Sequence, residues 1–440
     1  MGVKRVWSTT GVVALTGALL LTSASTASAD YVRDGQWPLT VYDAEKVWET
    51  SRGADVTVAV VDSGVDASHV DLTGQVLPGK DFTGSDNPQQ DNAGHGTGMA
   101  SLIAGHGHGA NGAAGVMGLA PESKILPVRV DTSENNVDTA ALTAGIRYAV
   151  DQGASVINLS IGDSSAYPGS KAAEAIAYAQ DHDVVVVAAT GNDAGTVSYP
   201  AALPGVVAVS AVDQSLGFWG KSNTGNVTVA APGVQTPQAD PTSPSGYVKA
   251  DGTSGSAAYV SAIVALLRSE YPNLSAGQTI NRLIKAASFL ENKGKKAPDS
   301  QLGYGIARPG SALTMDIPAG PKEGPLAKAS TSTNSGAASD GDDSKTQAKK
   351  KSKSSSGGIL VIAGIAAVVV VIAILFAVIR SRRNRGNRGG GPGSGGGTPG
   401  YPVGYPQQPP TGQQPYPYPP DAGQSQGYPT PPGQPPRHGQ

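Results

Sequence analysis

Short, continuously apolar runs rich in valine recur between residues 56 and 231, and they constrain the fold of this 440-residue chain more than any other feature. Such runs predict strands that are buried on both faces, as in a parallel sheet. Helical patterns at 136–153 and 170–183 separate some of them. This alternation predicts an open, mostly parallel α/β sheet flanked by helices on both faces, with ligands bound beyond the carboxyl ends of the strands. The predicted strands are residues 56–61, 125–130, 155–161, 184–189, 206–212 and 227–231.

The N-terminus has the composition of a secretory signal peptide. Lys4 and Arg5 precede an apolar run, and a small-residue A-x-A pattern ends at Ala29. We therefore expect residues 1–29 to direct export. A short transmembrane anchor is the alternative that this pattern leaves open.

A second apolar segment, 359–379, carries no charge and is long enough to span a bilayer. Arginines follow it directly, which favours a cytoplasmic C-terminus. Lysines precede it as well, so the exported N-terminal part decides the orientation. We predict a single transmembrane helix at 358–380 in the cell membrane, followed by a disordered cytoplasmic tail, 381–440, rich in Gly, Pro, Tyr and Gln.

Composition divides the rest of the chain. Residues 30–51 form a short lead-in, residues 52–314 have the composition of one large globular domain, and residues 315–357 indicate a disordered stalk. Within 30–341, acidic residues outnumber basic ones, which argues against nucleic acid as a partner. The positive charge beside the apolar segment instead favours an anionic membrane. The chain has no cysteine, which excludes disulfides and thiolate chemistry.

Three motifs place reactive side chains near the ends of predicted elements. Asp62 follows the strand 56–61, His95 stands between glycines in NAGHGTGMASLIAG, and Ser254 begins the helical stretch in DGTSGSAAYVSAIVALL. Each has a simpler interpretation: an aspartate that caps a turn, an ordinary capped loop, and a serine at a helix N-cap. Together they give aspartate, histidine and serine in one of the chain orders known for catalytic triads.

The combination predicts nucleophilic catalysis. Ser254 Oγ would attack a carbonyl carbon, His95 would accept its proton and return it to the leaving amine, and Asp62 would orient the imidazole. A serine hydroxyl needs such a neighbouring base. Asn192, just past the strand 184–189, is a candidate donor to the oxyanion beside the backbone N–H of Ser254. A turn asparagine is the simpler alternative at this position.

The blocks VAVVDSGVD, GHGTGMAS, INLSIG, VVVVAATGN and DGTSGSAAYVSAIVALL resemble, in the same order, those of the subtilisin-like serine proteases, or subtilases. The resemblance covers about residues 48–314. It implies the subtilase fold, with the three residues above as the triad and the asparagine as the oxyanion donor. It also implies that an edge after the strand 155–161 pairs with substrate backbone by β-augmentation.

This resemblance predicts where substrate binds. The pairing edge would be Ser160, Ile161 and Gly162. The pocket for the residue before the scissile bond (P1) would also use Ala188, Ala189 and Gly191, with residues 199–201 near its base. These linings are small and neutral, so we expect uncharged P1 side chains.

The layout of signal peptide, domain, stalk and apolar helix resembles the mycosins, the membrane-anchored subtilases of type VII secretion systems. This implies a serine endopeptidase that cleaves protein or peptide substrates outside the cytoplasm and works with type VII secretion components. A non-catalytic scaffold of a secretion complex is the alternative. An α/β-hydrolase esterase is excluded, because Ser254 lies outside a G-x-S-x-G motif and follows the histidine in the chain.

The chain departs from the family in small ways. Ala258 stands where subtilases usually have proline, Gly255 adds backbone freedom beside the serine, and the cysteines that mycosins often carry are missing. The lead-in is shorter than an independently folded propeptide. We therefore expect folding without a cleaved chaperone domain.

No metal or other cofactor is predicted. His106 and His108 lie in a glycine-rich stretch without a third ligand, and residues 83–92 lack the ligand spacing and terminal glutamate of an EF-hand. The two histidines are therefore a weak metal signal, and a solvated loop is the favoured interpretation of residues 83–92. Structural calcium elsewhere, which the resemblance to subtilases allows, is left open.

Overall fold

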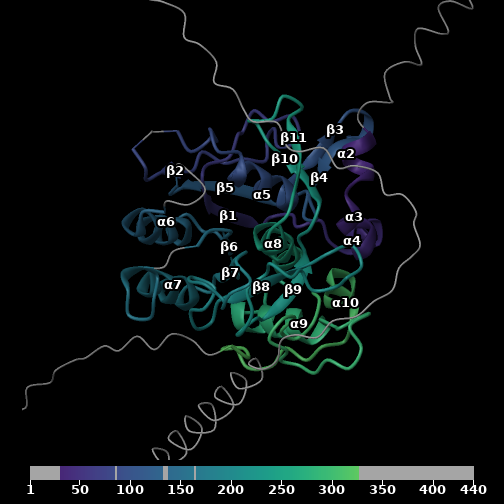
Figure 1. The fold of residues 1–440 in the computed structure, drawn as a ribbon. Coiled ribbons are helices and arrows are strands. Elements are labelled where there is room, and N and C mark those ends of the chain that lie inside the picture. Colours follow the sequence, from purple (N-terminus) through teal and green to yellow (C-terminus); the bar gives the residue numbers. More distant parts are fainter. Residues whose placement is uncertain (1–29, 85–86, 132–136, 163–164, 327–440) are drawn as a thin grey trace, which may run out of the picture. The chain divides into compact units, whose positions relative to one another are not determined.

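The computed structural model describes residues 30–84, 87–131, 137–162 and 165–326 (Figure 1). The predicted signal peptide, most of the stalk, the predicted transmembrane helix and the tail lie outside these residues. Within the described part of the chain, no helix is both long enough and apolar enough to cross a membrane.

A seven-stranded parallel sheet forms the centre of the domain, in the order β2-β5-β1-β6-β7-β8-β9 (Figure 1). Six of its strands were predicted, whereas β2 is too short to leave a sequence pattern. After β1 the chain forms β2 and β5 on one side of it and then crosses to β6 on the other side. Such a reversal of strand order opens a crevice at the carboxyl ends of the strands. The strands are β1 (Thr57–Asp62), β2 (Lys80–Asp81), β5 (Lys124–Arg129), β6 (Val156–Leu159), β7 (Val185–Ala189), β8 (Val207–Val212) and β9 (Val229–Pro232).

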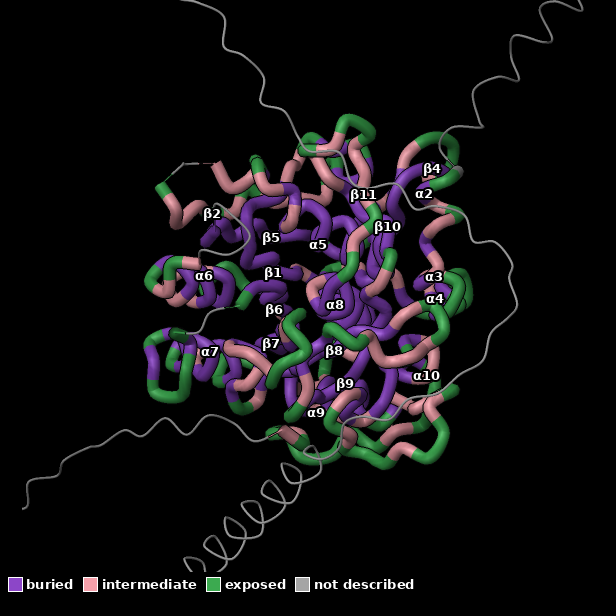
Figure 2. The backbone as a smooth tube through the Cα atoms, viewed as in Figure 1, coloured by how far each residue is buried: buried purple, intermediate pink, exposed green. Residues whose placement is uncertain are grey.

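Helices cover both faces of the sheet, as predicted. Successive strand residues point to opposite faces. Val58 and Val60 thus belong to the core cluster that includes residues of α5, α8 and α9, whereas Ala59 and Val61 belong to the cluster that includes residues of α6 and α7. α8 is buried at the centre of the described domain (Figure 2). The helices of these two layers are α5 (His95–Ala104), α6 (Thr139–Asp151), α7 (Lys171–Asp181), α8 (Thr253–Glu270), α9 (Ala276–Ala286) and α10 (Pro309–Thr314).

Two short antiparallel hairpins complete the domain. β3 (His106–His108) pairs with β4 (Ala114–Met117), around the short 3-10 helix η1 (Ala110–Gly112). β10 (Thr236–Ala239) pairs with β11 (Tyr247–Ala250) and leads the chain from β9 into α8.

The lead-in is an integral part of the domain. It folds into α2 (Asp30–Asp34), α3 (Trp37–Tyr42) and α4 (Ala44–Thr50). Gln36 pairs with the backbone of Met117 in both directions, since its Nε2 donates to Met117 O at 2.9 Å and its Oε1 accepts from Met117 N at 2.9 Å. These polar anchors fix the lead-in against β4.

The first residues of the predicted stalk also pack against the domain, so the folded segment extends beyond residue 314. Asn281 Nδ2 on α9 donates to Pro318 O at 3.1 Å, and Gln278 Nε2 donates to Gly320 O at 2.9 Å. Composition gave no signal for these bonds, because backbone carbonyls accept them. Ile317 and Leu326 also pack against the core.

Replacing Gln36 with alanine tests whether the lead-in stabilises the domain. The change leaves the backbone N–H and C=O of Met117 buried without their partner, so we expect the free energy of unfolding to fall by about 2–4 kcal/mol. Denaturant titration of the purified chain measures this. Asp34→Ala, at an exposed position on the same segment, is the control and should stay within about 0.5 kcal/mol of the parent. Equal stability of the two variants would show that the lead-in is only loosely attached.

Candidate active site

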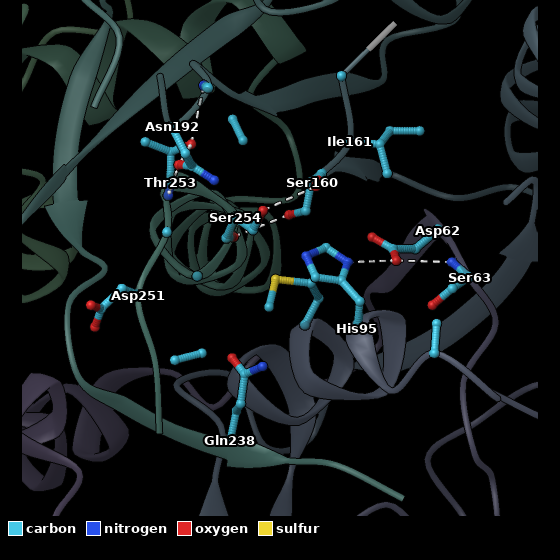
Figure 3. A pocket seen from close by; sticks show the side chains of 18 of the residues that line it. Asp62, Ser63, His95, Ser160, Ile161, Asn192, Gln238, Asp251, Thr253 and Ser254 are labelled. Carbon is cyan, nitrogen blue, oxygen red and sulfur yellow. Dashed lines mark hydrogen bonds and ion pairs between the residues drawn. The ribbon is translucent and has the colours of Figure 1, made fainter. Parts of the chain in front are cut away.

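A cavity of about 570 Å³ lies at the carboxyl ends of the strands, and it brings together the four residues to which catalysis was assigned. Asp62 comes from the end of β1, His95 from the start of α5, and Ser254 from the start of α8 (Figure 3). Asn192 follows β7 and lines the same cavity. Segments that are distant in the sequence therefore meet at one cavity.

Asp62 and His95 form a pair in which the carboxylate is buried and the imidazole is partly exposed. Asp62 Oδ1 lies 2.7 Å from His95 Nδ1 and accepts the backbone N–H of Ser63 at 2.8 Å. The Asp62 side chain is 1% exposed and the His95 side chain 21% exposed. In the tautomer whose Nδ1–H donates to the carboxylate, Nε2 is the ring nitrogen that can accept a proton. Figure 3 shows this second nitrogen on the side of Ser254.

Asp91, which the sequence analysis did not single out, shapes the loop that carries His95. Its Oδ1 accepts Ser63 Oγ at 2.9 Å and the backbone N–H groups of Ala93 and Gly94 at 3.1 and 2.9 Å. Its Oδ2 accepts both the N–H and the hydroxyl of Thr97 at 2.8 and 2.7 Å. One buried carboxylate thus ties the turn before α5 to its first turn. An aspartate just before a helix start is the only sequence signal for this role.

Ser254 is the second residue of α8 and not its N-cap, so the simpler interpretation of this serine is wrong. Gly252 occupies the N-cap without a side-chain bond. Ser254 Oγ donates to Ser160 O at 3.0 Å, and Ser160 Oγ lies 3.1 Å from Ser254 O. The hydroxyl therefore lies at the positive end of a long helix, where developing negative charge is stabilised.

Asn192 is held by one end of its amide. Its Oδ1 accepts both the N–H and the hydroxyl of Thr253 at 2.9 Å. The same hydroxyl accepts from Gly191 N at 3.1 Å. Among the described residues Nδ2 has no acceptor, so it remains available as a donor toward the cavity (Figure 3). Thr253, which sequence reasoning missed, fixes this orientation.

Comparison with known proteins agrees with this geometry. The Subtilase family model (Peptidase_S8) matches residues 53–305, more than half of the chain. The chain belongs to the subtilase family. Thermitase from Thermoactinomyces vulgaris is 36% identical over 247 residues, which cover 56% of this chain and 86% of thermitase. Subtilisin DY from Bacillus licheniformis is 36% identical over 245 residues, covering 54% and 86% of the two chains.

Solved structures of mycosins are similar as well. MycP1 from Mycobacterium smegmatis has a TM-score of 0.55 at 27% identity and covers 66% of this chain and 87% of its own. MycP3 protease from the type VII (ESX-3) secretion system has a TM-score of 0.55 at 30% identity, covering 64% and 88%. The predicted resemblance of this subtilase to mycosins is confirmed.

Most of the predicted substrate-binding residues line the cavity, and one does not. Ser160, Ile161, Gly162, Ala189 and Gly191 all border it. Ala188 has no exposed surface and packs in the core beneath α6 and α7. This assignment needs correction, because neighbouring residues of β7 point to opposite faces of the sheet.

Gly191 is required by the backbone. Its φ of 107° lies in the region that favours glycine, and a Cβ would stand 2.3 Å from Asn223 Nδ2. Asn223 Oδ1 in turn accepts from Asp193 N at 3.0 Å and Gly195 N at 2.9 Å. The side chain of Asn223 thus holds the loop that carries Asn192.

The β10–β11 hairpin forms a second wall of the cavity that the sequence analysis did not foresee. Its end is anchored by Tyr247, whose hydroxyl donates to Asp71 Oδ2 at 2.9 Å. Burial, followed by the charge of Asp71, raises the pKa of Tyr247, so the phenol stays protonated and able to donate. His69 Nε2 adds a contact to Gly246 O at 3.0 Å.

The other candidates of the sequence analysis have structural contacts. His108 Nδ1 pairs with Asp71 Oδ1 at 2.6 Å, and His106 Nε2 lies 3.0 Å from Thr73 O. Both lie in β3 and not in a loop. In the described ranges no group of three or more metal-ligating side chains is placed to hold an ion. Gly255 is buried in α8, with Thr236 Oγ1 3.4 Å from where a Cβ would stand.

Replacing Asp91 with alanine tests how the His95 loop is held. Five hydrogen bonds are lost at once, so we expect the free energy of unfolding to fall by roughly 3 kcal/mol or more. Hydrogen exchange should also accelerate at the backbone amides of residues 93–97. Asp66→Ala removes a local turn contact at a partly exposed position and is the matched control. Unchanged protection of these amides in the Asp91 variant would contradict this account.

Proposed function

We propose that this subtilase is a serine endopeptidase that hydrolyses peptide bonds through an acyl-enzyme, with Asp62, His95 and Ser254 as its triad. The observation that carries the proposal is the Asp62–His95 pair at 2.7 Å, which faces a cavity shared with Ser254 at the start of α8. The membership of the subtilase family supports the same reaction.

The acylation step follows from this arrangement. Ser254 Oγ turns from the carbonyl of Ser160 toward His95, a rotation about one side-chain bond, and attacks the carbonyl carbon of the scissile peptide. His95 Nε2 takes the hydroxyl proton, and the charge that forms on the ring is stabilised by the Asp62 carboxylate. His95 then gives the proton to the leaving amine, and the C–N bond breaks.

The negative oxygen that forms in this step needs donors. Asn192 Nδ2 and the backbone N–H of Ser254 are the proposed pair, and the positive end of α8 favours the same charge. Water then attacks the acyl-enzyme with His95 as the base, which releases the acid product and restores Ser254.

The acyl part of the substrate is expected along Ser160, Ile161 and Gly162. Gly162 is exposed, and a Cβ there would meet only Tyr199 O, at 4.0 Å, so substrate backbone has room to pair with this edge. The P1 side chain would enter beside Ala189, Gly191 and Tyr199. This lining carries no charge of its own, which supports uncharged P1 residues.

We further propose that the chain is anchored in the cell membrane, with its catalytic domain outside and its tail in the cytoplasm. The support is the signal-peptide pattern of residues 1–29 and the uncharged segment 359–379. The likeness to MycP1 and MycP3 supports a role beside type VII secretion components. Substrates are then exported proteins or peptides, and nucleic acid is not an expected partner.

A fluorophosphonate probe separates the protease from a scaffold, which is the alternative function for a mycosin-like chain. We expect the probe to label the chain, and labelling to disappear in Ser254→Ala because the nucleophile is lost. Ser68→Ala, which changes an exposed serine, should label like the parent. A folded parent that resists the probe, together with normal secretion in the Ser254 variant, would favour the scaffold.

Replacing Asn192 tests the oxyanion donor. Asn192→Leu removes the amide at similar size, and we expect kcat on a peptide substrate to fall by about 10²–10³-fold, a magnitude known from a subtilisin, while KM changes little. The reason is that the donor acts on charge present only in the transition state. Asn226→Leu, at an exposed position outside the cavity, is the control. A loss confined to KM would assign Asn192 to substrate binding instead.

A further inference from the structure

One face of the β10–β11 hairpin borders the cavity on the side away from Ile161. Thr236 pairs with Ala250 and Gln238 pairs with Val248, and all four residues line the cavity. The alternate residues, such as Lys249, belong to the opposite face. The hairpin therefore presents a short wall, in which Gln238 carries the only side-chain amide.

Gln238 is a buried residue whose side-chain amide has no hydrogen-bond partner among the described residues. The residue is 6% exposed, and no described residue accepts or donates a hydrogen bond to its side chain. Figure 3 shows the amide below His95, on the cavity side of the hairpin. Buried polar groups are normally paired, so an unpaired amide that borders a binding cavity points to a ligand that completes it.

The chain makes room for this amide. Gly98 lies inside α5, where glycine is unfavourable. A Cβ on Gly98 would stand 2.5 Å from Gln238 Nε2 and 2.9 Å from Cδ. The absence of a side chain at residue 98 therefore lets Gln238 lie against α5, within the cavity wall.

The place of Gln238 identifies the part of the substrate that it would meet. The acyl part is assigned to Ser160, Ile161 and Gly162, on the far side of Ser254. The leaving peptide must lie on the side of His95, because His95 protonates its nitrogen. Met99, Gln238 and Val248 also line the cavity, and Figure 3 shows Gln238 on the side of His95 away from Ile161.

We propose that Gln238 is a specificity-determining residue that binds the first side chain of the leaving peptide (P1′) and selects an uncharged hydrogen-bonding group such as Asn, Gln or Ser. This inference rests on the proposed protease function. An amide both donates and accepts, so it matches another amide or a hydroxyl better than an apolar side chain. Asp240 and Asp251 also border the cavity and oppose an acidic P1′ residue.

The test uses the full chain and internally quenched peptides that differ only at P1′, with Asn, Gln, Ser, Leu, Lys or Asp. We expect kcat/KM for Asn, Gln and Ser to exceed that for Leu by about tenfold, the effect of one buried hydrogen bond made or lost. Gln238→Met keeps the length of the side chain but cannot donate, and it should reduce this preference to within about twofold. Lys249→Met, on the opposite face of the hairpin, should keep it.

A second variant does not alter Gln238 itself. Gly98→Ala pushes the amide from its place, so the preference for Asn over Leu should fall here as well. If Gln238→Met and Gly98→Ala both retain the preference, or if the parent prefers Lys, the proposal for Gln238 is overturned.

The proposed function is checked in the same experiment with a p-nitroanilide, which has no P1′ side chain. A parent that cleaves the anilide and all peptides without preference at P1′ overturns the role of Gln238 alone. A folded parent that cleaves neither kind of substrate overturns the protease and this inference together.

Discussion

The contact between the buried carboxylate of Asp62 and the imidazole of His95 is the interaction on which the site depends. A carboxylate at the end of a fully buried strand is costly unless donors surround it. Only Oδ1 has protein donors here, from His95 and Ser63, while Oδ2 is buried with no partner among the described residues. The sheet that buries Asp62 thus makes the histidine hard to replace, and the loop held by Asp91 keeps the ring in place. The stability of β1 and the orientation of His95 consequently depend on the same hydrogen bond.

α8 is the second support, because the cavity is assembled around its first turn. Its backbone and Thr253 orient Asn192, and Ser254 exchanges contacts with Ser160. Ser256 Oγ, one turn inside, donates to Ala231 O at 2.9 Å and so ties the helix to β9. Since α8 is buried along nearly its whole length, a shift of the nucleophile would require repacking of the core. The packing of the whole domain therefore holds the candidate nucleophile in place, despite the backbone freedom that Gly255 adds.

Burial on both faces of the sheet explains what the sequence could predict. The valine-rich runs identify strands such as β7 and β8 without ambiguity, and the strand-end rule places Asp62 and Asn192 at one edge. Periodicity cannot predict contacts in which a side chain bonds the backbone of a distant segment, such as those of Gln36 with Met117. It also fails for Ala188, because a continuously apolar strand does not show which of its residues face the cavity. The residues that were missed are those whose role depends on tertiary register.

Asn192 and Gln238 lie on two sides of the nucleophile, and both have amide groups with unused hydrogen-bonding capacity. Thr253 holds Asn192 in place, and the space at Gly98 admits Gln238. Each of the two side chains has hydrogen-bonding capacity that the described residues do not use. Polar groups without a protein partner lower the stability of the domain when no substrate is bound, because only water can pair with them. A pure docking scaffold gains nothing from this cost, because its partner would contact exposed surface. Groups held in place but left incomplete are useful to a site that binds a passing peptide and stabilises charge on it, and this favours catalysis over scaffolding for the cavity.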